Sequence, residues 1–106
     1  MRIYISGPIT GHEKTARWNF ADAVKTVFNA YGTDTEIINP FEIGKEAGFM
    51  ANLTHTEYME MSFLLMTFCD AIYFMPGWEN SKGCKMERIY AENRKMKIIE
   101  SMEVSQ

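Results

Sequence analysis

The residues best placed to do chemistry lie in one short stretch, Ser81–Glu87, where a serine and a glycine precede a glutamate. The stretch follows an apolar run, Ala71–Met75, and opens a segment with helical periodicity. At the start of a helix, free backbone N–H groups and the positive end of the helix dipole favour an anion such as phosphate. Glu87 lies about one to two turns inside this helix. One element is therefore expected to hold a phosphate and to present a carboxylate, a combination suited to glycosidic chemistry on a nucleotide.

A glutamate on a helix has a simpler interpretation, because most such carboxylates are solvated or paired with a neighbour such as Lys82 or Arg88. The position of Glu87 behind a Ser-x-Gly sequence, at an expected cleft, favours the catalytic interpretation. Retaining glycosidic chemistry uses a carboxylate nucleophile and usually a second acid for the leaving group. For an N-glycosidic bond, the leaving base can also be protonated at a ring nitrogen.

A second glycine turn, Gly7–Gly11, follows a β-rich run, Arg2–Ser6. It matches neither a Walker A loop nor the Gly-x-Gly-x-x-Gly fingerprint. The sequence leaves open whether it contacts a ligand or only links a strand to a helix. Since side chains alternate along a strand, Tyr4 and Ser6 share a face. The Tyr4 hydroxyl is expected either to hydrogen-bond and hold Glu87 or to pack in the core.

The other polar and aromatic residues suggest no separate site. Trp18 and Trp78 either stack on a base or pack in a core or interface. Asp70 stands at the start of a strand, far from its carboxyl end, and reads as structural. Cys84 lies near a helix start, where thiolates are favoured. The two histidines and two cysteines lack zinc spacing, so we expect no metal and no cofactor.

Strands alternate with helices along the chain, which predicts a parallel sheet covered on both faces. The expected fold is a small doubly wound α/β domain, flavodoxin- or Rossmann-like, spanning residues 1–106 as one domain. Ligands bind such sheets beyond the carboxyl ends of the strands, so both glycine turns should face one cleft. The expected strands are Arg2–Ser6, Thr35–Asn39, Asp70–Met75 and Lys97–Ile99. The expected helices are Glu13–Tyr31, a second helix that Thr54 or Thr56 caps and that ends near Cys69, and Ser81–Arg94. The segment Phe41–Thr54 is expected to be loop-rich and in part helical. Glu100–Gln106 is expected to be a frayed tail.

Composition narrows the function classes. The chain has 106 residues and a net charge of −3, which argues against nucleic acid as the main partner. No apolar run approaches the ~20 residues of a membrane span, and the N-terminus lacks a signal-peptide layout. Two cysteines fit a reducing, cytoplasmic location. Nine methionines, and a cleft to maintain in so small a domain, predict a homo-oligomer.

Several segments together resemble the nucleoside 2-deoxyribosyltransferase-like superfamily, especially its short members near the nucleoside 5′-monophosphate N-glycosidases. The segments that carry the resemblance are Tyr4–Gly11, Trp18–Phe20, Ile38–Pro40 and Cys69–Gly83, with Glu87. The resemblance spans roughly residues 1–99. Members of this superfamily transfer deoxyribose between bases or hydrolyse the N-glycosidic bond of nucleotides.

The resemblance implies a Rossmann-like fold, a nucleophile at Glu87 that forms a covalent glycosyl-enzyme, and Tyr4 as the residue that positions it. It also implies a 5′-phosphorylated substrate, because the transferases acting on free nucleosides tend to carry an acidic residue where Ser81 stands. A carboxylate repels phosphate, whereas a hydroxyl and backbone N–H groups bind it. Family members are dimers or larger, with a neighbouring subunit helping to close each site.

One position departs from the family pattern. Ser62 stands where many members have an Asp that contacts the sugar or helps to protonate the base. A serine hydroxyl can hydrogen-bond but cannot act as an acid near neutral pH. Three interpretations therefore stay open: a nucleotide N-glycosidase (a hydrolase), a non-catalytic nucleotide-binding or sequestering protein, and a deoxyribosyltransferase. Beside Glu87 and Tyr4 as catalytic residues, the expected substrate-binding residues are Gly7, Pro8, Ile9, Thr10, Gly11, Asn19, Ser62, Gly77, Trp78, Asn80, Ser81 and Gly83.

Overall fold

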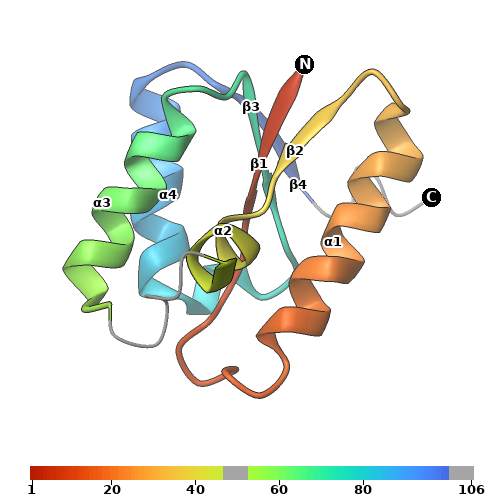
Figure 1. Ribbon diagram of the computed structural model, residues 1–106. Helices are drawn as coiled ribbons and strands as arrows, with labels where there is room; N and C mark the ends of the chain where they lie inside the picture. Colours follow the sequence, from red (N-terminus) through yellow and green to blue (C-terminus); the bar gives the residue numbers. More distant parts are fainter. Residues whose placement is uncertain (47–52, 101–106) are drawn as a thin grey trace.

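The computed structural model describes residues 1–46 and 53–100, and its centre is a four-stranded parallel sheet (Figure 1). The strand order is β2-β1-β3-β4, and all three neighbouring pairs run parallel. This arrangement confirms the predicted small doubly wound α/β fold with a flavodoxin-like strand order. The strands are β1 (Arg2–Ser6), β2 (Glu36–Ile38), β3 (Ala71–Phe74) and β4 (Lys97–Glu100).

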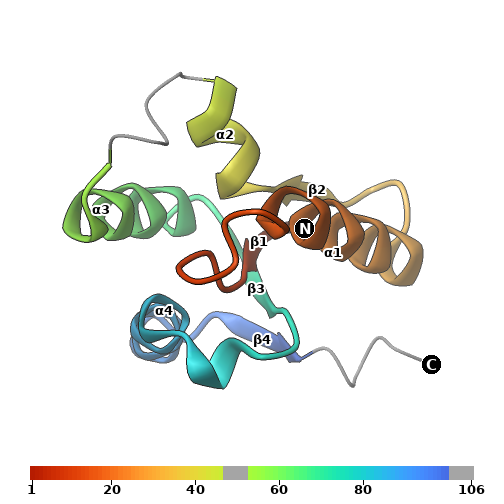
Figure 2. The same ribbon diagram turned by 90° about the horizontal axis from the view of Figure 1, so that it is seen from below.

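Helices cover both faces of the sheet, with α1 on one side and α3 and α4 on the other (Figure 2). The sheet is therefore buried on both faces, which explains why β3 is apolar at every position. The helices are α1 (Ala16–Tyr31), α2 (Pro40–Glu46), α3 (His55–Met66) and α4 (Lys82–Asn93), with a 3₁₀ turn, η2, at Trp78–Asn80.

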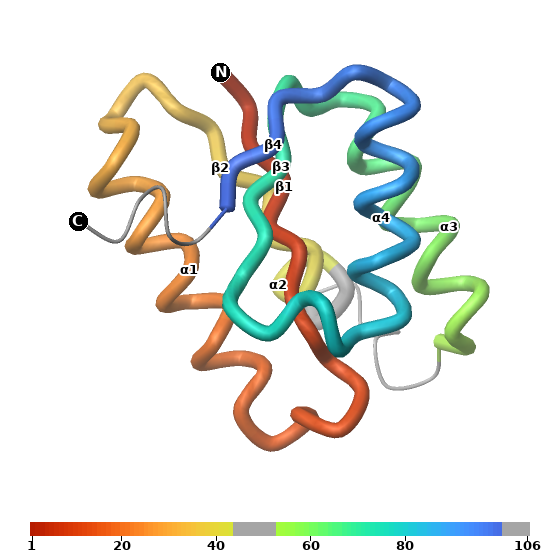
Figure 3. The backbone as a smooth tube through the Cα atoms, turned by 180° about the vertical axis from the view of Figure 1, so that it is seen from behind, coloured from red at the N-terminus to blue at the C-terminus, as the bar shows by residue number. Residues whose placement is uncertain are grey.

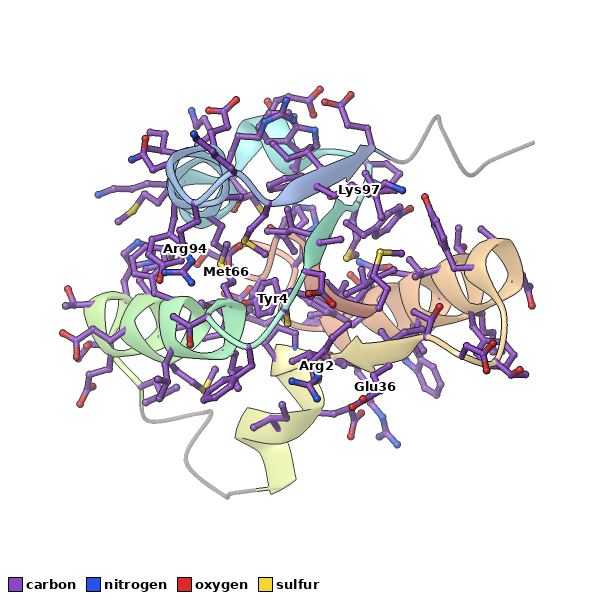
Figure 4. All side chains as sticks on the ribbon, turned by 90° about the horizontal axis from the view of Figure 1, so that it is seen from above. Arg2, Tyr4, Glu36, Met66, Arg94 and Lys97 are labelled. Atoms are coloured by element: carbon purple, nitrogen blue, oxygen red, sulfur yellow. The ribbon has the colours of Figure 1, made fainter. Side chains whose placement is uncertain are left out.

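The alternation of side chains along β1 divides the core into two layers. Ile3 and Ile5 pack in the layer against α1, with Phe20 and Val27. Tyr4 packs in the opposite layer, and Figure 4 shows it beside Met66 at the centre of the molecule. Ser6 is also buried, at the end of β1. The pleat thus directs two hydroxyl groups of β1 toward α3 and α4.

Local signals fix the start of the two helices that matter most for the site. Thr54 and Glu57 form a reciprocal capping box at α3: the Glu57 backbone N–H donates to Thr54 Oγ1 at 3.1 Å, and the Thr54 N–H donates to Glu57 Oε1 at 2.9 Å. Ser81 caps α4 by accepting a hydrogen bond from the Cys84 N–H at 3.2 Å. The prediction that Ser81 opens the helix carrying Glu87 is confirmed.

Some predicted boundaries differ from the structure. The first helix begins at Ala16 instead of Glu13, because the preceding residues form a turn in which the His12 N–H donates to Ile9 O and the Ala16 N–H to His12 O. The segment after β2 is more helical than expected, since α2 starts directly at Pro40, a favoured first helical residue. Parts of two predicted segments, 47–52 and 101–106, lie outside the described residues.

The chain leaves β1 toward α1 on one face and leaves β3 toward η2 and α4 on the other. Figures 1 and 3 show both connections at the same end of the sheet. A hydrogen bond of 2.9 Å from the Met75 N–H to the Ser6 carbonyl joins the two strands where they end. This is the topological switch point of the fold, where the Gly7–Gly11 turn and the Gly77–Gly83 segment are expected to meet.

The opposite end of the sheet is held by charged residues. The Arg2 guanidinium pairs with Glu36 at 3.4 Å, and the Arg2 backbone N–H donates to Asp70 Oδ2 at 2.9 Å. Figure 4, viewed from this end, shows Arg2 beside Glu36. The placement of Asp70 confirms that it is a structural residue, remote from the switch point.

Candidate functional site

Glu87 lies in the second turn of α4 and points at the end of β1, where its side chain is only 3% exposed. Two hydroxyl groups of β1 hold its carboxylate. The Tyr4 hydroxyl donates to Oε2 at 2.7 Å, and the Ser6 hydroxyl donates to Oε1 at 2.6 Å. The predicted hydrogen bond from Tyr4 to Glu87 is therefore confirmed, and Ser6 adds a second bond that secures the other oxygen.

A third hydroxyl supports this pair from α3. Ser62 is completely buried, and its Oγ lies 2.8 Å from the Tyr4 hydroxyl oxygen. Because the single proton of Tyr4 is donated to Glu87, the Ser62 hydroxyl must donate to the Tyr4 oxygen. The three groups form a chain from Ser62 through Tyr4 to Glu87, in which each bond polarises the next.

Burial governs the protonation of these groups. It raises the pKa of Glu87 above that of an ordinary glutamate, while the hydroxyls of Ser6, Tyr4 and Ser62 lower it in part. Burial, and then the charge of Glu87, raise the pKa of Tyr4 well above its usual value. The Tyr4 hydroxyl therefore stays protonated and remains a hydrogen-bond donor to the carboxylate.

A cleft of about 670 Å³ opens over Glu87 at the switch point. Its walls come from the turn after β1, the start of α3 and the start of α4. It thus brings together two glycine turns that are far apart in the sequence, as predicted. The predicted residues that line it are Gly7, Ile9, Thr10, Ser81, Gly83 and Glu87.

Two glycines of the cleft wall lie close to methionine side chains: Gly7 leaves no space for a Cβ atom, and Gly83 leaves little. A Cβ atom on Gly7 would lie 2.1 Å from the Met75 sulfur, and one on Gly83 would lie 3.3 Å from the Met59 sulfur. Their backbones therefore approach the neighbouring elements closely, which is a common reason for glycine at a ligand-binding turn.

The described part of the cleft offers an anion backbone N–H groups and no long cationic side chain. Within residues 1–46 and 53–100, neither lysine nor arginine lines it, and its ionisable residues include Glu13, His55 and Glu87. The start of α4, a helix of 12 residues, directs its first N–H groups and its dipole toward this space. An anion bound there would lie near Ser81 and Gly83.

The remaining predicted binding residues divide into two groups. Pro8, Asn19, Gly77 and Asn80 line a neighbouring hollow of about 520 Å³ between α1 and the segment after β3. Thr10 and Ser81 line both hollows. The Gly7–Gly11 turn therefore separates two adjacent spaces, where the sequence suggested one.

Gly11, Ser62 and Trp78 line neither hollow. Gly11 adopts a positive φ of 84°, and its N–H donates to the Glu13 carboxylate at 3.1 Å. Ser62 lies beneath the cleft, in contact with Tyr4. The Trp78 ring packs on Phe74 at 5.0 Å, so it braces the segment after β3 and is not available to stack on a base in the cleft.

Trp18, the other proposed stacking residue, is 63% exposed on α1. The Arg17 guanidinium lies over its ring, 5.3 Å from the centroid. Neither tryptophan therefore faces Glu87, and the base-stacking interpretation of the two tryptophans finds no support in the cleft.

Sequence reasoning missed several residues of the cleft. Tyr58 and His55 line it from α3, and Glu13 and Cys84 line it from the other walls. One signal was available for Tyr58, which stands four residues before Ser62 and so shares its helix face. The expectation of a favoured thiolate at Cys84 is wrong, because burial raises the pKa of this thiol.

Two further searches of the described residues complete the picture. Within the described ranges, none of the helices combines the length and apolar character that crossing a bilayer requires. In the same residues, no group of three or more His, Cys, Asp or Glu side chains is arranged to bind a metal ion.

Comparison with known proteins gave one match. The model of the family described as "Domain of unknown function (DUF4406)" matches residues 1–100, nearly the whole chain. Searches of the curated proteins and of the solved structures found no match.

Proposed function

The chain belongs to the DUF4406 family, and we propose that it hydrolyses the N-glycosidic bond of a nucleoside or deoxynucleoside 5′-monophosphate. The observation that carries this proposal is the Glu87 carboxylate, buried at the base of a cleft and held through both oxygens by Tyr4 and Ser6. A fixed, desolvated carboxylate beside a space for an anion is what a retaining glycosidase needs.

The proposed reaction has two steps. A Glu87 oxygen forms a bond to C1′ as the bond from C1′ to the base nitrogen breaks, and the electron pair leaves with the base, which takes up a proton from solvent. Water then attacks C1′ of the glycosyl-enzyme and gives up a proton to solvent as the bond from C1′ to Glu87 breaks, which releases the sugar 5-phosphate and regenerates the carboxylate. Tyr4 and Ser6 keep the carboxylate in one orientation, so little conformational freedom is lost when it attacks.

The 5′-phosphate is assigned to the start of α4 and the Gly7–Gly11 turn. Backbone N–H groups and the helix dipole stabilise a phosphate there without a lysine or arginine. Glu87 is about one to two turns further along the same helix. A phosphate at the helix start therefore places the sugar, which is attached to it, over the carboxylate.

A second candidate is a protein that binds nucleotides without cleaving them. Ser62 favours it, because this residue is buried against Tyr4 at the position where the family resemblance places an acid. A serine there supplies no proton to a leaving base near neutral pH. A third candidate, deoxyribosyl transfer, keeps the Glu87 chemistry but replaces water with a free base.

The experiment incubates the protein with a panel of ribo- and deoxyribonucleoside 5′-monophosphates, and chromatography measures the free base that is released. The wild-type protein is expected to release base, and Glu87→Gln, which keeps the size of the side chain, is expected to release none. Mass spectrometry of the quenched reaction should detect the glycosyl-enzyme only in the wild type.

The alternatives give different results in the same assay. Tight nucleotide binding by calorimetry, with no base release above that of Glu87→Gln, would support the binding protein and rule out the hydrolase. Transfer of the sugar to an added free base, faster than hydrolysis, would support the transferase.

A further inference from the structure

One polar group of the cleft has no part in the proposed reaction. Tyr58 lies on α3, lines the same cleft as Glu87, and stands one helical turn before the buried Ser62. Its pKa is raised by burial first and by the charge of Glu87 second, which places its hydroxyl in the electrostatic field of the carboxylate. Tyr58 is therefore a neutral polar side chain on the α3 wall of the cleft.

Tyr58 lies on the same face of α3 as Ser62, where the chain of hydroxyls that ends at Glu87 begins. Ser62 and Tyr4, the two inner members of that chain, both lie close enough to influence the Tyr58 hydroxyl. A phenol has one proton to donate and lone pairs that accept. The Tyr58 oxygen can therefore accept a hydrogen bond from a group bound in the cleft.

The stereochemistry of a nucleotide determines which of its groups lies near the Tyr58 oxygen. The base of a β-nucleotide occupies one face of the sugar ring, so a nucleophile that displaces it reaches C1′ from the opposite face. In ribose, the 2′-hydroxyl projects from that same opposite face, beside C1′. The groups that flank Glu87 therefore flank the 2′-position of the sugar.

The two flanks of Glu87 differ. The glycine turns and the start of α4 are assigned to the phosphate, and so to the C5′ side of the sugar. The C2′ side then faces α3, where Tyr58 lies. Since the surrounding wall includes Met59 and Phe41, a sugar without a 2′-hydroxyl would leave the Tyr58 oxygen facing apolar atoms.

We propose that Tyr58 makes the site selective for ribonucleotides, by accepting a hydrogen bond from the 2′-hydroxyl of the bound nucleoside 5′-monophosphate. This inference rests on the proposed function for the placement of the sugar, and it goes further by naming the sugar and the residue that selects it.

The test is calorimetry with AMP, GMP, CMP and UMP and with their 2′-deoxy counterparts. For the base that binds best, the ribonucleotide is expected to bind about 3- to 10-fold more tightly, the effect of one neutral hydrogen bond. The arabinonucleotide, whose 2′-hydroxyl lies on the other face of the ring, should bind like the deoxynucleotide.

Tyr58→Phe removes only the hydroxyl and is expected to bring the ratio of the two Kd values to about 1, leaving deoxynucleotide binding unchanged within about twofold. Tyr90→Phe is the matched control. It deletes the same atom from a tyrosine that stacks on Phe63 at 4.6 Å and does not line the cleft. This control should keep the preference for ribose, and thermal unfolding of both variants verifies that they fold.

Each outcome bears on the inference. Equal binding of the two sugars, a preference for deoxyribose, or an unchanged ratio in Tyr58→Phe would overturn it while leaving N-glycosidic cleavage possible. Failure to bind any of the eight nucleotides would overturn it together with the proposed function. Ribose-selective binding that depends on Tyr58, without base release, would support this inference and reject the hydrolase.

Discussion

Replacing Tyr4 by phenylalanine tests the energetics on which the site depends. The change removes one oxygen atom that is fully buried and lies between two partners, 2.7 Å from Glu87 Oε2 and 2.8 Å from Ser62 Oγ. A hydrogen bond to a charged group contributes about 1.5–3 kcal/mol, and a bond between neutral groups about 1 kcal/mol. We therefore expect Tyr4→Phe to lower the free energy of unfolding by about 2–4 kcal/mol at pH 7.5, where more of Glu87 is ionised.

The loss should depend on pH with a defined sign. Tyr4 lowers the pKa of Glu87, which burial has raised, so its removal raises that pKa further. Ionisation of Glu87 then costs more in the folded state of the variant, so the destabilisation relative to the wild type grows as pH rises through the raised pKa of the wild type toward the higher pKa of the variant. Near pH 4, where Glu87 is protonated, we expect a loss of only about 1–2 kcal/mol.

Urea unfolding at both pH values measures this effect, and a double-mutant cycle with Glu87→Gln isolates it. In the glutamine background the charge is absent, so Tyr4→Phe should cost about 1–2 kcal/mol at either pH. Tyr73→Phe is a matched control, because Tyr73 is 3% exposed on β3 and packs in the layer against α1. The loss of stability caused by Tyr73→Phe should be the same at both pH values.

Two results would refute the reasoning. If Tyr4→Phe destabilised the protein equally at pH 4 and pH 7.5, Glu87 would not ionise in contact with Tyr4. If the loss were the same in the wild-type and Glu87→Gln backgrounds, the bond from Tyr4 to the carboxylate would add nothing to a neutral contact.

Two further predictions concern the same end of the sheet. Ser6→Ala removes a hydrogen bond of 2.6 Å that lowers the pKa of Glu87. The acidic limb of the pH profile of kcat/KM for base release should therefore move to higher pH. A limb that stays in place, or that moves to lower pH, would contradict this prediction. Gly77→Ala places a side chain at a φ of 87°, which is expected to cost about 1–2 kcal/mol in urea unfolding, whereas full stability would show that the segment after β3 relaxes without strain.

Several parts of this site follow from local sequence patterns. The alternation of Tyr4 and Ser6 on one face of a strand, and the Ser81 cap before Glu87, depend on neighbours a few residues away. The doubly wound fold follows from strands that alternate with helices, and the switch point then brings the two glycine turns together. These features were predictable because strand pleat, helix capping and crossover handedness are properties of short segments.

Other parts depended on how the elements pack. The sequence placed Trp78 in the ligand site, but its half-buried ring packs on Phe74 and lies under the Arg88 guanidinium instead. The sequence predicts a loop-rich and partly helical segment at Phe41–Thr54 and does not locate α2, since a helix of seven residues that begins at Pro40 carries little periodicity.

By itself, the sequence determined the order of strands and helices, the element that carries Glu87 and the face that carries Tyr4. Only the tertiary structure decided that α3 supplies Ser62 to Tyr4 and Tyr58 to the cleft over Glu87, and that two hollows flank the Gly7–Gly11 turn. The reason is physical. Secondary structure and helix caps arise from contacts within a few residues. The register of α3 against β1 and α4 is instead set by close packing of side chains that lie more than fifty residues apart along the chain, such as Tyr4 and Ser62.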